Sequence, residues 1–147
     1  MYRLLSILLF AFGLAVTTDE IYDNSHALLI GIDKYQNVGS LDYAVKDAED
    51  IKSVLIDKFH FQQDNIVLLK NEEATKAKII QEFSNITKIA SKNDRVLIFF
   101  AGHGRTKDLP DGGEMGYLLP VDAYDDLYVS AIPMEEIKTI SLLSKAK

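Results

Sequence analysis

Residues 96–104, VLIFFAGHG, are the stretch of this sequence that decides its fold. Six apolar residues in a row, with no polar side chains alternating between them, predict a strand buried on both faces. The strand runs into Gly102, His103 and Gly104. Loops at the carboxyl edge of a parallel sheet form the ligand crevice of an α/β fold, so His103 is a candidate functional residue. Taken alone, the tripeptide favours a structural or solvated histidine whose glycines serve only the turn.

Two further apolar runs, residues 27–32 and 66–69, also predict buried strands. The segment between them carries apolar residues three and four positions apart, which indicates one buried face of a helix. These residues are Leu41, Ala44, Val45, Ala48, Ile51, Leu55 and Phe59. Ser40 is the expected N-cap of this helix. A second helix is expected from the N-cap Thr75 to near Asn93, and its buried stripe is Ile79, Ile80, Phe83, Ile86 and Ala90.

The order strand, helix, strand, helix, strand predicts an α/β fold in three layers, with a mainly parallel sheet between helices and right-handed crossovers. After the third strand we expect a loop over residues 106–113, a short apolar piece at 116–119 and an acidic loop at 122–126. Pro133 suits the first turn of a last helix. The expected buried face of that helix is Met134, Ile137, Ile140 and Leu143.

Length and composition indicate a one-domain protein and exclude several classes of function. The chain has 147 residues, 48% of them hydrophobic, which is enough for one domain with one core. Its net charge is −6 and no cluster of Lys or Arg stands out, so nucleic acid is not an expected partner. The sequence has no cysteine, which excludes disulfides, thiolate zinc sites and a cysteine nucleophile within these residues.

The N-terminal residues resemble a secretory signal peptide. Arg3 precedes an apolar run over residues 4–16 that is broken only by Ser6 and Gly13. The run is shorter than the roughly 20 residues of a membrane-spanning helix, and small residues allow cleavage after Ala15. We therefore expect a signal peptide over 1–15, a short linker over 16–25 and one domain over 26–147. The mature protein is expected to be exported without stable membrane association; the alternative is an uncleaved anchor.

Several motifs in order identify a family. They are Ala27 to Ile32 with Gly31 and Tyr35, Leu41-x-x-Ala44-x-x-Asp47-Ala48, Ala74-Thr75, Phe99 to Gly104, and Gly116 to Asp122. From about residue 26 to 147 the sequence resembles the large-subunit portion of caspase-like cysteine peptidases, in particular the metacaspase and prokaryotic branch. The resemblance implies a three-layer caspase-like fold and protein or peptide substrates. It also implies that His103 is half of a Cys-His dyad and that the N–H of Gly104 stabilises the oxyanion.

The resemblance places the family's cysteine on the next parallel strand, beyond Lys147. We therefore expect a peptidase domain that is incomplete at its C-terminus and inactive by itself. The alternative is a non-catalytic caspase-fold domain with a binding or regulatory role. A serine hydrolase is disfavoured because the sequence has no Gly-x-Ser-x-Gly elbow. The oligomeric state is left open.

Two aspartates are candidate substrate-binding residues. The resemblance implies that Asp47 pairs with a basic P1 side chain, so that the complete protein cleaves after Arg or Lys. The alternative is that Asp47 is a solvated helix acid, like Asp42 and Asp50. Asp33 follows the first strand and is expected either to orient the loops of the site or to cap the turn.

No cofactor is expected to be required, and no metal site is predicted. Calcium activation occurs in many metacaspases, and carboxylates are suitable ligands for calcium. The candidates are Asp111, Glu114, Asp122, Asp125, Asp126, Glu135 and Glu136. Their spacing matches no EF-hand loop, and Met134-Glu135 stands where the family carries paired aspartates. Solvated loop charges are therefore the favoured interpretation.

Overall fold

The computed structural model describes residues 21–146. A central sheet holds three parallel strands in the order β2-β1-β3, namely β1 (Ser25–Gly31), β2 (Ile66–Lys70) and β3 (Arg95–Ala101). The strand-helix-strand-helix-strand order predicted from the apolar runs is confirmed. The expected signal peptide, residues 1–15, lies outside the described residues, as does the first half of the expected linker.

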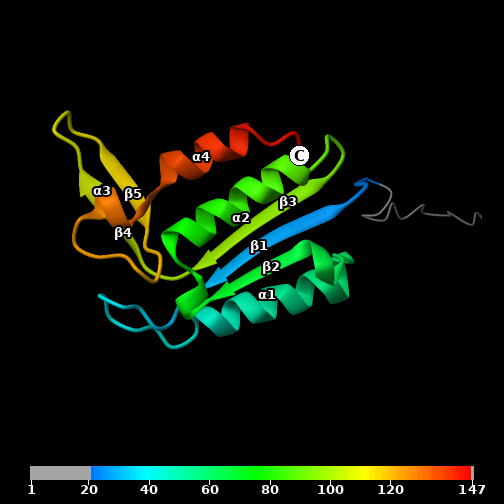
Figure 1. The fold of residues 1–147 in the computed structure, drawn as a ribbon, viewed down its shortest axis with the longest axis horizontal. Coiled ribbons are helices and arrows are strands. Elements are labelled where there is room, and N and C mark those ends of the chain that lie inside the picture. Colours follow the sequence, from blue (N-terminus) through cyan, green and yellow to red (C-terminus); the bar gives the residue numbers. More distant parts are fainter. Residues whose placement is uncertain (1–20, 147) are drawn as a thin grey trace, which may run out of the picture.

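Helices cover both faces of this sheet (Figure 1). Helix α1 (Ala44–Phe59) packs on one face, and α2 (Lys76–Ile89) and α4 (Met134–Leu142) lie on the other. Alternate residues of β1 divide between two cores. Ala27 and Leu29 join the core under α1, whereas Leu28 and Ile30 join the core under α2. The three-layer α/β fold expected from the sequence is therefore confirmed.

The strands differ in how completely they are buried. Strand β1 is buried along nearly its whole length because it has a neighbour on each side. Strand β3 is half-buried at every position, so its predicted burial on both faces is wrong. The physical reason is its place in the sheet: among residues 21–146, β3 pairs only with β1 and forms one edge.

A second, antiparallel sheet follows β3. Its order is β4-β5-β6, with β4 (Gly104–Asp108), β5 (Glu114–Leu118) and β6 (Ile132–Pro133). The loop expected over residues 106–113 is thus partly wrong, because its first three residues belong to β4. All five residues of β4 are exposed, so the strand has no apolar pattern that sequence analysis could detect. The one-turn helix α3 (Leu127–Ser130) precedes β6.

Of the two predicted N-caps, one is confirmed and one is wrong. Thr75 caps α2 as predicted, because its hydroxyl accepts a hydrogen bond from Lys78 N–H at 3.2 Å. Ser40 is not the cap of α1, which begins at Ala44 and is capped from another segment. Helix α2 ends at Ile89 rather than near Asn93. Two 3-10 turns, Gln63–Asn65 and Asn71–Glu73, flank β2.

Helix α4 is half-buried in its middle and exposed at its ends. Ile137 and Ile140 pack against the core under α2, as predicted. Met134 is 47% exposed and Leu143 is 72% exposed, so the expected burial of these two residues is wrong. Leu143 follows the last residue of the helix, and Met134 is its first residue.

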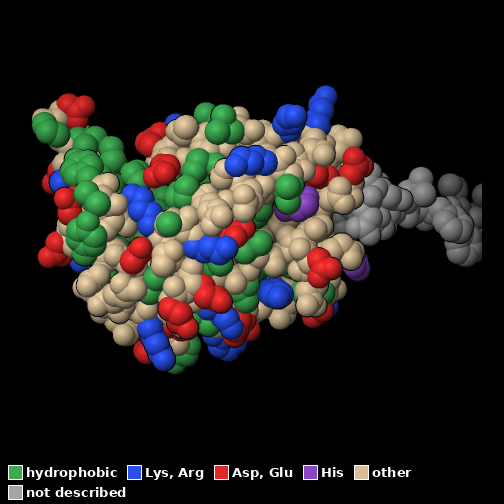
Figure 2. Space-filling model, in the orientation of Figure 1, with side chains coloured by type: hydrophobic (Ala, Val, Ile, Leu, Met, Phe, Trp, Pro, Cys, Tyr) green, Lys and Arg blue, Asp and Glu red, His purple; other side chains and the backbone are tan. Residues whose placement is uncertain are grey.

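Hydrophobic side chains gather on the surface at the end of the molecule formed by β4, β5 and α3 (Figure 2). Exposed apolar residues of this part of the chain include Tyr124, Tyr128 and Val129. Over the rest of this face acidic and basic side chains are mixed. No helix within residues 21–146 is both long enough and apolar enough to cross a membrane.

Candidate active site

His103 lies in the two-residue turn between β3 and β4. Its ring atom Nε2 is 2.8 Å from the carbonyl oxygen of Gly39. Because a carbonyl oxygen can only accept, Nε2 is the donor, and in the neutral imidazole Nδ1 carries the lone pair. The backbone N–H of His103 donates to the Tyr35 hydroxyl at 2.7 Å, and the Tyr35 ring centroid is 4.9 Å from that of the imidazole. The histidine is thus fixed as a base whose Nδ1 can accept a proton.

Tyr35 holds His103 as a neutral hydroxyl. Burial raises the pKa of this hydroxyl, and the hydrogen bond from the backbone N–H of His103 only partly offsets the effect. Tyr35 therefore stays protonated at physiological pH while it accepts that bond. It belongs to the segment between β1 and α1, so this segment supports the histidine through both Tyr35 and Gly39.

Gly102 is required by close packing. A Cβ atom at this position would lie 2.5 Å from the Tyr35 hydroxyl oxygen and 2.9 Å from the Phe100 ring. Neither Gly102 nor Gly104 has a positive φ, so the turn does not need them for that reason. Gly102 therefore allows the Tyr35 hydroxyl to reach the backbone of His103.

The amide of Gly104 points away from the hairpin. Leu119 N–H donates to the carbonyl of His103 at 3.0 Å, and Gly104 is the residue opposite Leu118. In an antiparallel pair hydrogen-bonded and non-hydrogen-bonded positions alternate, so the Gly104–Leu118 pair is of the second kind. The N–H of Gly104 is consequently directed outward, next to His103. An outward N–H beside a base is suited to stabilise an oxyanion.

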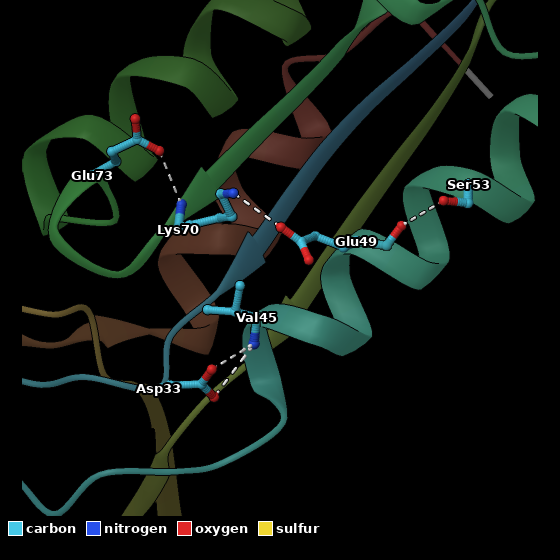
Figure 3. A network of polar contacts seen from close by, with 6 residues as sticks. All are labelled: Asp33, Val45, Glu49, Ser53, Lys70 and Glu73. Carbon is cyan, nitrogen blue, oxygen red and sulfur yellow. Dashed lines mark hydrogen bonds and ion pairs between the residues drawn. The ribbon is translucent and has the colours of Figure 1, made fainter.

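Asp33 is the residue that caps α1. Its Oδ1 accepts a hydrogen bond from Ala44 N–H at 2.7 Å, and both carboxylate oxygens lie 3.4 Å from Val45 N (Figure 3). A carboxylate at a helix N-terminus satisfies backbone donors and is stabilised by the helix dipole. The Asp33 side chain thus caps helix α1, whereas it was expected to cap the turn after the strand or to orient the loops of the site. A direct contact of Asp33 with substrate stays a prediction.

Asp47 lies in the first turn of α1 and is exposed. The helix begins where β1 ends, so Asp47 and His103 belong to the same carboxyl edge of the parallel sheet (Figure 1). Neighbouring charges are already paired: Lys46 with Asp50, and Lys70 with Glu49 at 2.9 Å (Figure 3). Within residues 21–146 the carboxylate of Asp47 has no ion pair or hydrogen bond. It is therefore available to a cationic ligand.

Two of the candidate calcium ligands have structural partners. Asp122 Oδ1 accepts a hydrogen bond from Lys76 N–H at 2.9 Å, and Asp126 Oδ1 accepts one from Tyr128 N–H at 3.2 Å. Both carboxylates thus cap helices. Glu135 lies 3.6 Å from Lys138 Nζ on the surface. In the part of the chain that the structure describes, no three His, Asp or Glu side chains are grouped so that they could hold a metal ion.

Sequence analysis missed two contributors to the site. One is the carbonyl of Gly39, which every residue type possesses and which no motif could single out. The other is Asn71, whose side-chain oxygen accepts hydrogen bonds from the N–H groups of Asp33 and Lys34 at 2.9 and 3.0 Å. Asn71 has a φ of 43°, a left-handed conformation that Asn tolerates better than most residues. An Asn directly after a predicted strand was the available signal.

The arrangement defines a three-layer α/β protein with a histidine at the carboxyl edge of its parallel sheet. A solved structure of a protein from Geobacter sulfurreducens has this fold: its TM-score is 0.67 at 21% identity, over 84% of this chain and 46% of the other. Residues 25–145 match the family model described as the metacaspase, peptidase C14 domain. The chain therefore belongs to the metacaspase family of caspase-like peptidases.

Individual relatives agree with the family model. Metacaspase-1 of Botryotinia fuckeliana is 35% identical in an alignment of length 106; the match covers 65% of this chain and 25% of the relative. Metacaspase-1 of Eremothecium gossypii is 33% identical in an alignment of length 110; the match covers 67% of this chain and 24% of the relative. The chain thus spans about a quarter of the length of these relatives.

Proposed function

We propose that this chain supplies the histidine and an oxyanion donor of a cysteine endopeptidase centre. The observation that carries the proposal is the geometry of His103. Its Nε2 is bound to the carbonyl of Gly39 at 2.8 Å, which leaves Nδ1 as the proton acceptor. The outward N–H of Gly104 stands directly beside it. Membership of the metacaspase family supports the assignment of both residues.

In the proposed reaction a cysteine thiol gives its proton to Nδ1 of His103, and the thiolate sulfur bonds to the peptide carbonyl carbon. The carbonyl oxygen becomes an oxyanion, to which Gly104 N–H donates; one such donor contributes on the order of 10²–10³ in rate. Protonated His103 then gives its proton to the leaving amine, and water hydrolyses the thioester. The 147 residues contain no cysteine, so the nucleophile must come from residues outside them. We expect the chain alone to hydrolyse no peptide bond.

We further propose that Asp47 selects Arg or Lys at the P1 position. Two features support this: the carboxylate is exposed and unpaired within residues 21–146, and α1 places it at the same sheet edge as His103. A carboxylate with no partner of its own binds a guanidinium or ammonium group without first breaking an ion pair.

A chimera tests the proposed function. The segment of Botryotinia fuckeliana metacaspase-1 that aligns with this chain is replaced by the corresponding residues of this chain, and cleavage is measured with peptides that end in Arg, Lys or Asp at P1. We expect cleavage after Arg and Lys, a loss of at least about 10²-fold in kcat/KM for His103→Ala, and a loss of Arg and Lys preference for Asp47→Asn. Asp57→Asn, an exposed acid farther along α1, is the matched control. Full activity of the His103→Ala chimera would overturn the proposal.

A binding or regulatory domain is the second candidate function, since the exposed carboxylate of Asp47 would serve peptide binding without cleavage. Such a domain would bind peptides at the same edge without cleaving them. The chimera separates the two: a folded chimera that binds Arg peptides but does not cleave them supports the binding domain.

We propose that catalysis requires no cofactor, that peptides rather than nucleic acids or membranes are the partners, and that the protein is exported after cleavage following Ala15. Mass spectrometry of the exported protein tests the last of these, since the N-terminus should be Val16.

A further inference from the structure

Asn71 connects β2 to the segment that supports the candidate catalytic histidine. Strand β2 runs parallel to β1, and Lys70 at its end is paired with Gly31. Asn71 follows directly, with a left-handed φ of 43°. From this position its Oδ1 accepts the N–H groups of Asp33 and Lys34 at 2.9 and 3.0 Å. The amide side chain thus fixes the first residues beyond β1.

Asp33 in turn anchors both ends of the segment between β1 and α1. Its carboxylate caps α1 through Ala44 N–H at 2.7 Å, and its own carbonyl accepts Leu41 N–H at 2.8 Å. The residues enclosed by these anchors include Tyr35 and Gly39. Those two residues make the contacts with the backbone and the ring of His103, respectively.

We propose that Asn71 is a positioning residue for His103. By holding Asp33 and Lys34 it sets the place of the segment, so that the Gly39 carbonyl meets Nε2 and keeps the imidazole in the tautomer with a free Nδ1. Strand β2 therefore contributes to the site although none of its side chains reaches the histidine. The catalytic consequence rests on the function proposed above, whereas the effect on the tautomer does not.

Other bonds hold the middle of the segment. Gln36 N–H donates to the carbonyl of Val121 at 3.0 Å, and the Asn37 side chain donates to the carbonyl of Ala123 at 3.1 Å. Removal of the Asn71 side chain therefore leaves the segment attached to the acidic loop. We expect it to shift relative to His103 rather than to unfold, which makes the proposal testable in a folded variant.

The test measures the tautomer of His103 in the full chain by ¹⁵N NMR of labelled imidazoles at alkaline pH, where a free imidazole is neutral. The signal of His103 is assigned by its loss in His103→Gln. Asn71→Gly keeps the left-handed backbone but removes the acceptor; Asn71→Asp keeps an acceptor oxygen. We expect Asn71→Gly to shift the tautomer ratio toward protonated Nδ1 by roughly 2- to 10-fold, the range that one neutral hydrogen bond supports. Asn71→Asp should preserve the wild-type ratio.

His60→Gly is the matched control, since His60 also has a left-handed φ, of 57°, at the far end of α1. This variant should leave the ratio unchanged. An unchanged ratio in folded Asn71→Gly would overturn the proposal, as would an equal shift in Asn71→Asp or in His60→Gly. The two proposals fail separately: an inactive chimera contradicts the peptidase function, while a tautomer shift measured in the full chain still supports the role of Asn71.

Discussion

The Nε2 atom of His103 lies 2.8 Å from the carbonyl oxygen of Gly39, which precedes it by 64 residues. Together with the bond from His103 N–H to the Tyr35 hydroxyl, this contact joins the end of β3 to the segment after β1. The histidine is thereby held at two atoms by one segment. Several substitutions around this junction have measurable consequences.

Gly102→Ala should destabilise the protein by about 1–3 kcal/mol, because the new Cβ would lie 2.5 Å from the Tyr35 hydroxyl. Tyr35→Phe removes that oxygen and should itself cost about 1 kcal/mol through the lost hydrogen bond. The double variant should be more stable than the sum of the two effects predicts, because one clash has been removed. Urea unfolding of the four proteins measures this coupling. Strict additivity would contradict the close packing of Gly102 and Tyr35.

Gly31→Ala should also destabilise the fold by about 1–3 kcal/mol. A Cβ at Gly31 would be 2.6 Å from the carbonyl oxygen of Ala44 and 2.8 Å from the Cα of Val45, both backbone atoms that cannot move aside cheaply. Gly113→Ala is the control, since its nearest neighbour would be a Leu109 methyl group at 3.6 Å. Equal midpoints of urea unfolding for the two variants would show that β1 and α1 are less closely packed than the distances at Gly31 indicate.

Asp33→Ala should lower the free energy of unfolding by about 1–2 kcal/mol, the usual effect of losing a helix N-cap. The bond from Ala44 N–H to Asp33 Oδ1 is 2.7 Å long, and no other side chain among residues 21–146 caps α1. Ser40→Ala should have almost no effect, although Ser40 is the cap that the sequence suggests. The comparison is made by chemical unfolding at neutral pH. If Ser40→Ala lowered the free energy of unfolding more than Asp33→Ala, Ser40 and not Asp33 would be the cap of α1.

Stability should fall in acid because of Asp94. Burial by itself would raise the pKa of this carboxyl, but hydrogen bonds from Ser91 N–H and Asn24 and the nearby His26 outweigh it and lower the pKa below its ordinary value of 3.8. The unfolded state then binds the proton more readily than the folded state. The stabilising contribution is therefore complete above pH 3.8 and is lost as the pH falls through the lowered pKa.

Asp94→Asn should flatten the acid side of the stability profile, measured by urea unfolding between pH 7 and pH 2. Asp57→Asn changes an exposed carboxylate and should leave the slope unchanged. A wild-type slope in Asp94→Asn would show that other carboxylates govern acid unfolding.

The strands with a continuous apolar run and the helices with periodic apolar residues could be predicted from the sequence, whereas β4 could not. Residues 27–32 and 66–69 are apolar enough to predict strands, and Thr75 was recognisable as a cap because its partner is only three residues away. Strand β4 is polar and fully exposed, so its pairing with β5 alone defines it. Leu143 fits the helical spacing of α4 but lies beyond the last residue of the helix, in solvent.

By itself the sequence determined the order of strands and helices, the three-layer class and the position of His103 at the end of an apolar strand. These properties depend on residues that are close together in the sequence. The spacing of apolar side chains along a helix or strand therefore reveals them. Only the tertiary structure decided that Asp33 caps α1, that Asn71 holds Asp33 and that Gly39 binds Nε2 of His103. Each of these bonds joins residues that are 11 to 64 positions apart. A backbone carbonyl or a polar side chain has many possible partners at such separations, and packing of the sheet and helices selects one.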